Sequence, residues 1–429
     1  MKVAFYTLGC KVNQYDTQTM EELFSRQGWE IVPFGEAADV TVINTCTVTA
    51  MSDKKSRQMI SRAHHVSPGG VIVVAGCYAQ RDAQQVLALP GVSVALGNRN
   101  RGSIVELAQR ALLDGEKIDA VSDIMRAREY EELSALCADR TRATLKIQDG
   151  CNRFCSYCII PYARGPIRSR RPEEVLAEVE RLSAQGFREF VLTGIHLASY
   201  GADNGSSLQK IIEQVSALPG VRRVRLGSLE PSVLTEEFCA SCAKNPRLCR
   251  QFHVSMQSGS ETVLRRMNRR YTPEEYAGYI QNIRKYMPGA AVTTDVIAGF
   301  CEETEQEHAE TMAFVERIGF ARIHVFPYSR REGTKAAAMR DLPRAVKEER
   351  AAELIALGKR LQEAYIDRAL GTVQEVLLEE PDEKGRMTGY TGTYLRVAVP
   401  DGKQGQIVPV RLVRREEGEL VIGEFFSGK

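Results

Sequence analysis

The sequence of 429 residues lacks a stretch that is apolar enough to cross a membrane. No run approaches the roughly 20 apolar residues that a membrane-spanning helix needs. The opening residues, MKVAFYTLGC, lack the apolar core and the cleavage site of a secretory signal peptide. We therefore expect a cytoplasmic protein without a membrane partner.

An excess of one charge is also missing. The chain has 57 lysines and arginines against 55 aspartates and glutamates, which leaves a net charge of only +2. The field of the whole molecule will therefore not attract a polyanion. Any contact with nucleic acid must come from a local patch of basic side chains.

A fourth cysteine is missing from each of two cysteine triads. The compact triad has the spacing Cys-x3-Cys-x2-Cys: Cys151, Cys155 and Cys158. The members of the scattered triad each follow a strand-like apolar run: Cys10, Cys46 and Cys77. The eleven cysteines are odd in number, which argues against a fully paired disulfide framework. Three thiolates can hold a cubane iron–sulfur cluster and leave one iron open for a substrate, so two triads indicate chemistry rather than electron storage.

The first part of the chain alternates Val- and Ile-rich runs with helix-length segments. This pattern predicts βαβ units and a parallel sheet, with helices near 14–27, 50–65, 79–88 and 102–114. Ligand sites in such sheets lie outside the carboxyl ends of the strands, where all three scattered cysteines fall. We expect residues 1–114 to form a parallel α/β domain that gathers these cysteines at one edge.

A second alternating series follows a charged, irregular segment, residues 115–140, which we interpret as a linker. Six strands are expected, at 144–148, 189–194, 223–228, 251–257, 291–299 and 321–328. Helical segments separate these strands, and a charged helix near 345–369 closes the series. The pattern of residues 141–370 therefore predicts a partial (β/α)6 barrel, whose active site lies at the carboxyl ends of the strands.

The last segment, residues 371–429, changes to short β-type runs separated by glycines and charged turns. This pattern predicts a small antiparallel β-barrel. The fold class is therefore α/β, with an N-terminal parallel domain, a central partial barrel and a C-terminal β-barrel.

Other interpretations of the cysteines stay open at this point. A zinc site at the compact triad needs a fourth ligand, such as His196 or His253, and short zinc motifs usually show paired ligands. Cys239, Cys242 and Cys249 are the alternative ligands of a separate zinc site, although this segment has the pattern of a helix and its end. The scattered triad has the alternative of three buried structural thiols, since free cysteine is often buried.

The compact triad resembles the motif of radical S-adenosylmethionine enzymes. In that family the Cys-x3-Cys-x2-Cys loop follows the first barrel strand and an aromatic residue precedes the last cysteine, as Tyr157 does here. The resemblance implies a 4Fe–4S cluster whose open iron binds the methionine part of S-adenosylmethionine. Cleavage then yields a 5′-deoxyadenosyl radical, while the protein supplies orientation and excludes water.

Along its whole length the chain resembles the methylthiotransferase branch of that family, which ends in a TRAM-type barrel. The matching motifs are LGCKVNQYDT (8–17), INTCTVT (43–49), AGCYAQ (75–80), CNRFCSYCIIPYARG (151–165), TGIHLASYG (193–201), SLEP (228–231) and HVSMQSGS (253–260). The first and the fifth of these most resemble the subfamily that acts on N6-threonylcarbamoyladenosine in transfer RNA. One departure is Cys301-Glu302, where the family usually has Pro-Gly, and this change alters the expected turn.

The resemblance implies that the enzyme replaces the C2 hydrogen of the modified adenosine with a methylthio group. It implies two 4Fe–4S clusters, one at each triad, with the scattered triad holding the sulfur to be delivered. It also implies contact with the tRNA anticodon arm and a reductant protein such as flavodoxin or ferredoxin. The alternatives are the same chemistry on a ribosomal protein and a non-catalytic iron–sulfur module that binds RNA.

Further site residues are expected near the compact triad. By resemblance or by position, five residues would contact the cofactor: Tyr157, Gly194, Ser228, Glu230 and Gln257. Four arginines fall within eight residues and would grip RNA phosphates: Arg164, Arg168, Arg170 and Arg171. In the C-terminal segment, Tyr390 or Tyr394 would stack on RNA bases beside a patch of Arg411, Arg414 and Arg415.

Overall fold

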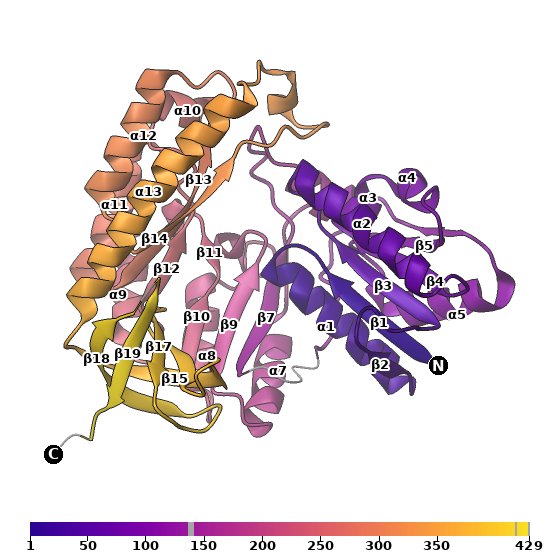
Figure 1. Ribbon diagram of the computed structural model, residues 1–429, viewed down its shortest axis with the longest axis horizontal. Helices are drawn as coiled ribbons and strands as arrows, with labels where there is room; N and C mark the ends of the chain where they lie inside the picture. Colours follow the sequence, from indigo (N-terminus) through magenta and orange to yellow (C-terminus); the bar gives the residue numbers. More distant parts are fainter. Residues whose placement is uncertain (136–140, 417, 428–429) are drawn as a thin grey trace.

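The computed structural model describes residues 1–135, 141–416 and 418–427. Figure 1 shows three units: an N-terminal α/β unit, a central barrel-like unit and a small C-terminal β-barrel packed below the central one. The five residues 136–140 of the expected linker lie outside the described residues. None of the helices in the described ranges is long and apolar enough to span a membrane.

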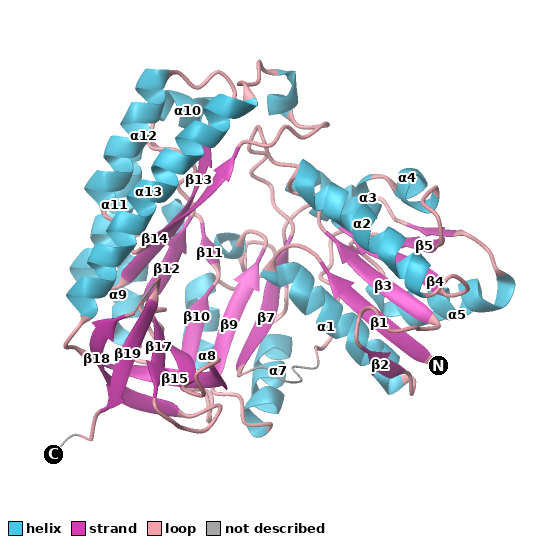
Figure 2. Ribbon diagram, viewed as in Figure 1, coloured by secondary structure: helices cyan, strands magenta, loops and turns pink. Residues whose placement is uncertain are grey.

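The N-terminal unit is a six-stranded parallel sheet in the order β2-β1-β3-β4-β5-β6 (Figure 2). Its strands are β1 (Lys2–Thr7), β2 (Glu30–Val32), β3 (Val40–Thr45), β4 (Val71–Gly76), β5 (Val92–Leu96) and β6 (Ile118–Ala120). Its helices are α1 (Lys11–Arg26), α2 (Ala50–Val66), α3 (Cys77–Arg81), α4 (Ala83–Leu87) and α5 (Ile104–Asp114), with the 3-10 turn η1 (Arg101–Ser103). Strands β3 and β4 are buried at every residue, as Val- and Ile-rich strands between two helical layers should be.

Two details of this unit differ from the sequence-based expectation. Strand β6 lies in the segment interpreted as a linker, and only Ile118 in it is buried, so it shows almost no apolar pattern. The helix expected at 79–88 is two helices. Asp82 separates them and its side chain accepts a hydrogen bond from the Gln85 amide, which caps α4.

The central unit holds the six expected strands in two sheets, β10-β9-β7-β8 and β11-β12-β13-β14, linked by a parallel bridge between Val224 and Leu248. The strands are β7 (Arg142–Asp149), β8 (Arg168–Ser169), β9 (Glu189–Gly194), β10 (Arg223–Leu226), β11 (Ser228–Leu229), β12 (Gln251–Val254), β13 (Ala291–Ala298) and β14 (Arg322–Pro327). The helices are α6 (Ile160–Arg164), α7 (Pro172–Ala184), α8 (Leu208–Ala217), α9 (Glu236–Lys244), α10 (Glu261–Arg266), α11 (Pro273–Tyr286), α12 (Glu305–Ile318) and α13 (Arg344–Ala369). The 3-10 turns are η2 (Ile124–Arg126), η3 (Leu197–Ser199), η4 (Pro231–Val233) and η5 (Lys335–Ala338).

Alternation along β7, β9 and β10 separates an apolar face from a polar one. The apolar side chains of these strands belong to the main core under the helices: Ala143, Leu145, Ile147, Phe190, Leu192, Val224 and Leu226. Successive side chains point to opposite faces of a strand. The face away from these helices therefore carries the intervening residues, among them Arg142, Lys146, Glu189 and Arg225.

The C-terminal unit is a closed barrel with the order β15-β16-β17-β19-β18. Its strands are β15 (Val373–Pro381), β16 (Met387–Thr391), β17 (Arg396–Val399), β18 (Ile407–Arg415) and β19 (Leu420–Phe425). The barrel is not wholly antiparallel as expected, because β17 and β19 pair in parallel. Ile366 of α13 joins the barrel core, which ties this unit to the central one.

Cys301-Glu302, which stand where the family usually has Pro-Gly, still form a tight turn before α12. Glu302 takes a left-handed backbone conformation with φ of 60°, and Cys301 is fully buried. The Glu303 carboxylate accepts from the Gly299 amide at 3.0 Å and pairs with Arg350 at 2.9 Å. These contacts hold the loop in place of the proline and glycine that the resemblance led us to expect.

Candidate functional site

The compact triad lies on a loop at the carboxyl end of β7. The amide of Cys151 donates to the Gly165 carbonyl at 3.0 Å, and the Ser156 amide donates to the Met267 carbonyl at 2.9 Å. Gly150 has φ of +76°, and a Cβ atom there would lie 1.9 Å from the Pro166 carbonyl oxygen. Only glycine fits at this position, so the backbone itself fixes where Cys151 begins the loop.

The three thiols of this loop are half-buried and lie beside positive charge. Burial and the neighbouring Cys155 raise the pKa of the Cys158 thiol to about 12. Arg269 donates to the Cys155 sulfur at 3.5 Å, and the Arg153 amide donates to the Cys151 sulfur at 3.4 Å. A thiol with a raised pKa is protonated at pH 7 when it is free, and coordination to a metal would deprotonate it. The donor set and its positive neighbours therefore fit an iron–sulfur cluster.

The five expected cofactor residues lie around the same end of the barrel. Tyr157 packs edge-on against Phe300, with ring centroids 6.2 Å apart. Gly194 ends β9, and a Cβ atom there would lie 2.8 Å from the Gln148 side-chain oxygen. Ser228 bonds the Ser255 hydroxyl at 2.9 Å, and Gln257 has φ of 70° just beyond β12. The role of these residues stays a prediction.

The Glu230 carboxylate already has a partner within the protein, Arg153, which the sequence did not single out as a candidate site residue. Glu230 pairs with Arg153 at 3.0 Å. The Arg153 guanidinium also lies 3.4 Å from the His196 ring. Burial and the charge of Arg153 lower the pKa of His196 to about 4, so this imidazole is neutral at pH 7. The sequence suggested His196 only as a zinc ligand, since nothing in the pattern linked it to Arg153.

The scattered triad lies at the carboxyl ends of three neighbouring strands. Cys10 follows β1, Cys46 follows β3, and Cys77 follows β4, in the sheet order β1-β3-β4. Gly9 has φ of +107°, and a Cβ atom there would lie 2.8 Å from the Cys46 Cβ. Burial and the charge of Cys77 raise the pKa of the Cys46 thiol to about 11. All ten cysteines in the described ranges are free thiols.

The zinc alternatives find no support in the geometry. In the described part of the chain no three or more His, Cys, Asp or Glu side chains converge as the ligands of one metal ion would, and this holds for the two triads as well as for the segment around Cys239. Cys239 and Cys242 are instead buried in the main core on α9.

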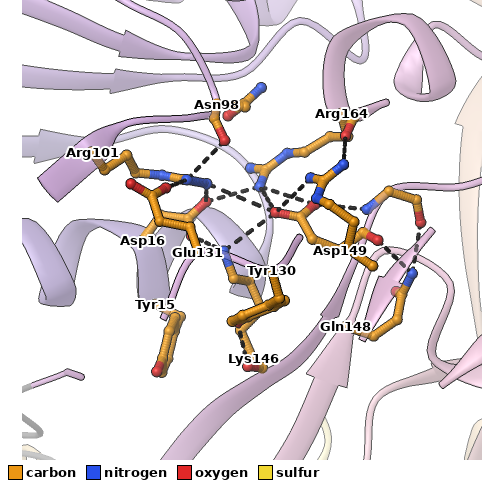
Figure 3. Close-up of polar contacts among 12 residues, drawn as sticks. Tyr15, Asp16, Asn98, Arg101, Tyr130, Glu131, Lys146, Gln148, Asp149 and Arg164 are labelled. Atoms are coloured by element: carbon orange, nitrogen blue, oxygen red, sulfur yellow. Dashed lines mark hydrogen bonds and ion pairs between the residues drawn. The ribbon is translucent and has the colours of Figure 1, made fainter. Parts of the chain in front are cut away.

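A buried network of charges connects the two triads (Figure 3). Arg164 donates to Asn13 at 2.6 Å and pairs with Asp16 of α1 at 2.9 Å and with Asp149 of β7 at 3.2 Å. Lys146 contacts the same two carboxylates, at 2.5 and 3.3 Å. Asp149 lies two residues before Cys151. The network therefore fixes the N-terminal unit against the strand that carries the compact triad.

The network also reaches the scattered triad. Asn98 donates to the Cys77 sulfur at 3.4 Å and to the Ala163 carbonyl at 2.8 Å, next to Arg164. Burial acts to lower the pKa of the Arg164 guanidinium, but the charges of Cys77, Asp149, Asp16 and Cys10 hold it well above the usual range. Arg164 is thus a permanent cation between the two sites.

The prediction that the four arginines contact RNA is wrong for three of them. Arg164, Arg168 and Arg170 are buried, with exposed fractions of 0%, 4% and 2%. Arg170 pairs with Glu178 and with Glu132, and Arg168 donates to the Arg164 and Pro166 carbonyls. Side chains committed to internal partners cannot reach a phosphate. Arg171 alone of the four is exposed.

The two tyrosines of the C-terminal barrel are also committed to internal contacts. Tyr390 and Tyr394 stack on each other, with centroids 4.8 Å apart. Arg142 of β7 lies over both rings, and Arg225 of β10 lies over Tyr394. These rings therefore take part in the contact between the barrel and the central unit, and they remain half-exposed, so stacking on RNA bases stays a prediction.

We expect the stability of the protein to fall in acid. Burial opposes ionisation of Asp16, but Arg101, Lys146 and Arg164 hold its pKa below the usual range, and Arg266 lowers the pKa of Glu307 to about 2. A carboxyl whose pKa is depressed by folding stabilises the folded state above its unfolded pKa of about 4, and this contribution is lost as the pH falls toward 2. Urea midpoints followed by Trp29 fluorescence and circular dichroism should drop between pH about 4 and 2. Glu307→Gln should show less of this drop, and equal midpoints at pH 5 and 2 would contradict the expectation.

Comparison with known proteins adds to this geometry. Residues 2–97 match the family described as Uncharacterized protein family UPF0004, residues 145–315 match the Radical SAM superfamily, and residues 367–420 match the TRAM domain. The chain is 43% identical over 433 residues to the threonylcarbamoyladenosine tRNA methylthiotransferase MtaB of Bacillus subtilis, covering 98% of this chain and 96% of that protein. It is 37% identical to the Aquifex aeolicus protein of the same name, covering 89% and 93%.

More distant similarities follow the same fold. A tRNA-2-methylthio-N(6)-dimethylallyladenosine synthase of Pseudothermotoga lettingae is 33% identical, covering 91% of this chain and 90% of that protein. Among solved structures, the radical S-adenosylmethionine methyltransferase TsrM of Kitasatospora setae, with cobalamin and a [4Fe-4S] cluster bound, superposes with a TM-score of 0.59 at 16% identity. It covers 78% of this chain and 76% of that one. At that identity the likeness concerns the fold alone.

Proposed function

Because this chain belongs to the family of the threonylcarbamoyladenosine tRNA methylthiotransferases, we propose that it replaces the C2 hydrogen of N6-threonylcarbamoyladenosine in tRNA with a methylthio group. The observation that carries the proposal is the pair of free cysteine triads, one on each side of a single buried charge network. The names of the relatives and the TRAM match favour a tRNA substrate over a ribosomal protein.

The residues that would hold the cofactors follow from this function. Cys151, Cys155 and Cys158 would bind one 4Fe–4S cluster, and the scattered triad would bind the second. When bound, the first cluster and one S-adenosylmethionine would supply the 5′-deoxyadenosyl radical, the second cluster would hold the sulfur, and another S-adenosylmethionine would supply the methyl group on that sulfur. The protein itself fixes the backbone at the start of the cysteine loop through Gly150. It also places the Arg269 guanidinium 3.5 Å from the Cys155 sulfur.

Arg153, His196 and Glu230 form a polar group beside the compact triad. Since His196 is neutral at pH 7, its ring can accept the Arg153 hydrogen bond without repulsion. Arg153 thereby orients the Glu230 carboxylate, which we propose contacts the ribose of S-adenosylmethionine. Tyr157, Gly194, Ser228 and Gln257 would line the rest of that cleft.

Electron supply, location and domain limits belong to the same proposal. Reductive cleavage needs one electron from outside, for which we propose a protein such as flavodoxin or ferredoxin. The location is proposed to be the cytoplasm, where tRNA and such reductants occur. The proposed domains are 1–114, the linker 115–140, 141–370 and 371–429, with the last contacting the anticodon arm.

The nucleoside product tests this function. We expect the reconstituted enzyme, with dithionite and S-adenosylmethionine, to convert N6-threonylcarbamoyladenosine in tRNA to its 2-methylthio derivative. Mass spectrometry of digested tRNA measures the product, and tRNA that lacks the threonylcarbamoyl group is the control. Formation of 5′-deoxyadenosine with an unchanged nucleoside profile would point to another substrate, and its absence would point to a non-catalytic module.

A further inference from the structure

A cavity of about 260 Å³ lies where the three units meet. Lys11 and Gln14 of α1 line one side, Thr144 and Val191 of the central sheet line another, and Tyr394 of the C-terminal barrel lines a third. Helix α1 contacts β7 and β9 directly, and Figure 1 shows it directed at these strands. The cavity therefore opens on the polar face of the central sheet.

Lys11 ties this cavity to the scattered triad. It directly follows Cys10, and consecutive Cα atoms lie about 3.8 Å apart. Its side chain is exposed to solvent, and it lines the cavity together with Arg142 and Tyr394. A lysine that is open to water and lines a cavity between three units can present its ammonium group to a ligand there.

The carboxylates around Lys11 already have arginine partners. Glu189 pairs with Arg225 at 2.7 Å and with Arg223 at 3.4 Å. Glu379 pairs with Arg142 at 2.7 Å. Glu380, which also lines the cavity, is exposed. Within the described ranges Lys11 makes no ion pair with any of them, so its positive charge is available to a ligand.

The proposed substrate places an anion close to this charge. In adenine, C2 and C6 both flank N1, so a base whose C2 lies at the scattered triad carries its N6 substituent a short distance away. The threonylcarbamoyl substituent ends in a carboxylate, whereas the dimethylallyl group of the more distant relative's substrate is apolar. An ammonium is a compact point charge with three donors, which suits a carboxylate and offers nothing to a hydrocarbon.

We propose that Lys11 binds the carboxylate of the threonylcarbamoyl group and so selects this nucleoside over one with an apolar N6 substituent. The inference rests on the proposed function and names the residue that reads its substrate. Lys11 is a specificity residue here, since it touches a part of the substrate that does not react.

Binding of matched RNAs tests the inference. Three anticodon stem-loops would differ only at one nucleoside: N6-threonylcarbamoyladenosine, its threonine carboxamide, and N6-dimethylallyladenosine. For the wild-type holoenzyme, fluorescence anisotropy should show binding of the first RNA at least about tenfold tighter than the carboxamide RNA, the loss expected for one charge-assisted hydrogen bond. Lys11→Met should remove this preference and raise KM more than it lowers kcat, and Lys11→Arg should keep most of it.

The controls separate recognition from folding and from phosphate binding. Lys210→Met, an exposed lysine on α8, should leave all three affinities unchanged. Lys11→Met should retain wild-type iron content and 5′-deoxyadenosine formation without tRNA. An equal loss of affinity for all three RNAs would make Lys11 a phosphate contact and overturn the inference.

The comparison of the carboxylate RNA with the carboxamide RNA can be made on the wild-type enzyme alone. If Lys11→Met does not hold its iron, equal affinity of the wild-type enzyme for the carboxylate and carboxamide RNAs still overturns the inference. The proposed function is judged separately, by whether the wild-type enzyme forms the methylthio product.

Discussion

Replacing Cys155 with alanine should reduce cleavage of S-adenosylmethionine to background. Cys155 supplies one of only three thiols on the compact loop, and its sulfur is the one that Arg269 contacts. With two thiols left, the loop cannot hold a 4Fe–4S cluster that keeps one iron open for S-adenosylmethionine. Chromatography of 5′-deoxyadenosine after anaerobic reaction with dithionite measures the loss.

The matched variant is Cys46→Ala in the scattered triad. It should still form 5′-deoxyadenosine but should transfer no methylthio group, and its iron content should fall to about half. Loss of S-adenosylmethionine cleavage in Cys155→Ala, together with retained cleavage but no methylthio transfer in Cys46→Ala, would show that the triads have separate roles. Retained cleavage in Cys155→Ala, or loss of cleavage in both variants, would contradict the assignment of the radical to the compact triad.

Replacing Arg164 with methionine should destabilise the protein by about 3 kcal/mol, the lower part of the range for breaking a buried ion pair. The change keeps much of the side-chain volume but removes the cation shared by Asp16 and Asp149. Lys146 and Arg101 still contact these carboxylates, which limits the cost. Urea unfolding followed by Trp29, the single tryptophan and a core residue of the N-terminal unit, measures the change.

Arg171→Met is the control for this prediction. Arg171 is exposed and pairs with Glu174 at 3.0 Å on the surface. An exposed ion pair contributes no more than about 1 kcal/mol, so this variant should unfold close to the wild-type midpoint. Equal midpoints for the two variants would show that the buried network does not stabilise the contact between the units.

The two arginine variants illustrate where sequence reasoning succeeded and failed. Arg164 and Arg171 lie in one short basic run, and their spacing alone does not distinguish a surface from an interior. The partners of Arg164 come from α1 and β7, far away in the chain. Sequence reasoning therefore interpreted as an RNA patch what is largely the interior of a domain contact. For the same reason, nothing in the sequence indicated that Arg142 and Arg225, from another unit, lie over Tyr390 and Tyr394.

By itself, the sequence determined the α/β class, the order of the three units and the position of each cysteine triad after a strand. These features depend on local periodicity and on short motifs, which can be recognised within a few residues of sequence. Only the tertiary structure decided which charged groups are buried, that β17 and β19 pair in parallel, and that Lys11 faces a cavity shared by three units. Such features depend on partners that are distant along the chain, and whether an ionic side chain faces water or a counter-ion is settled only when those partners meet.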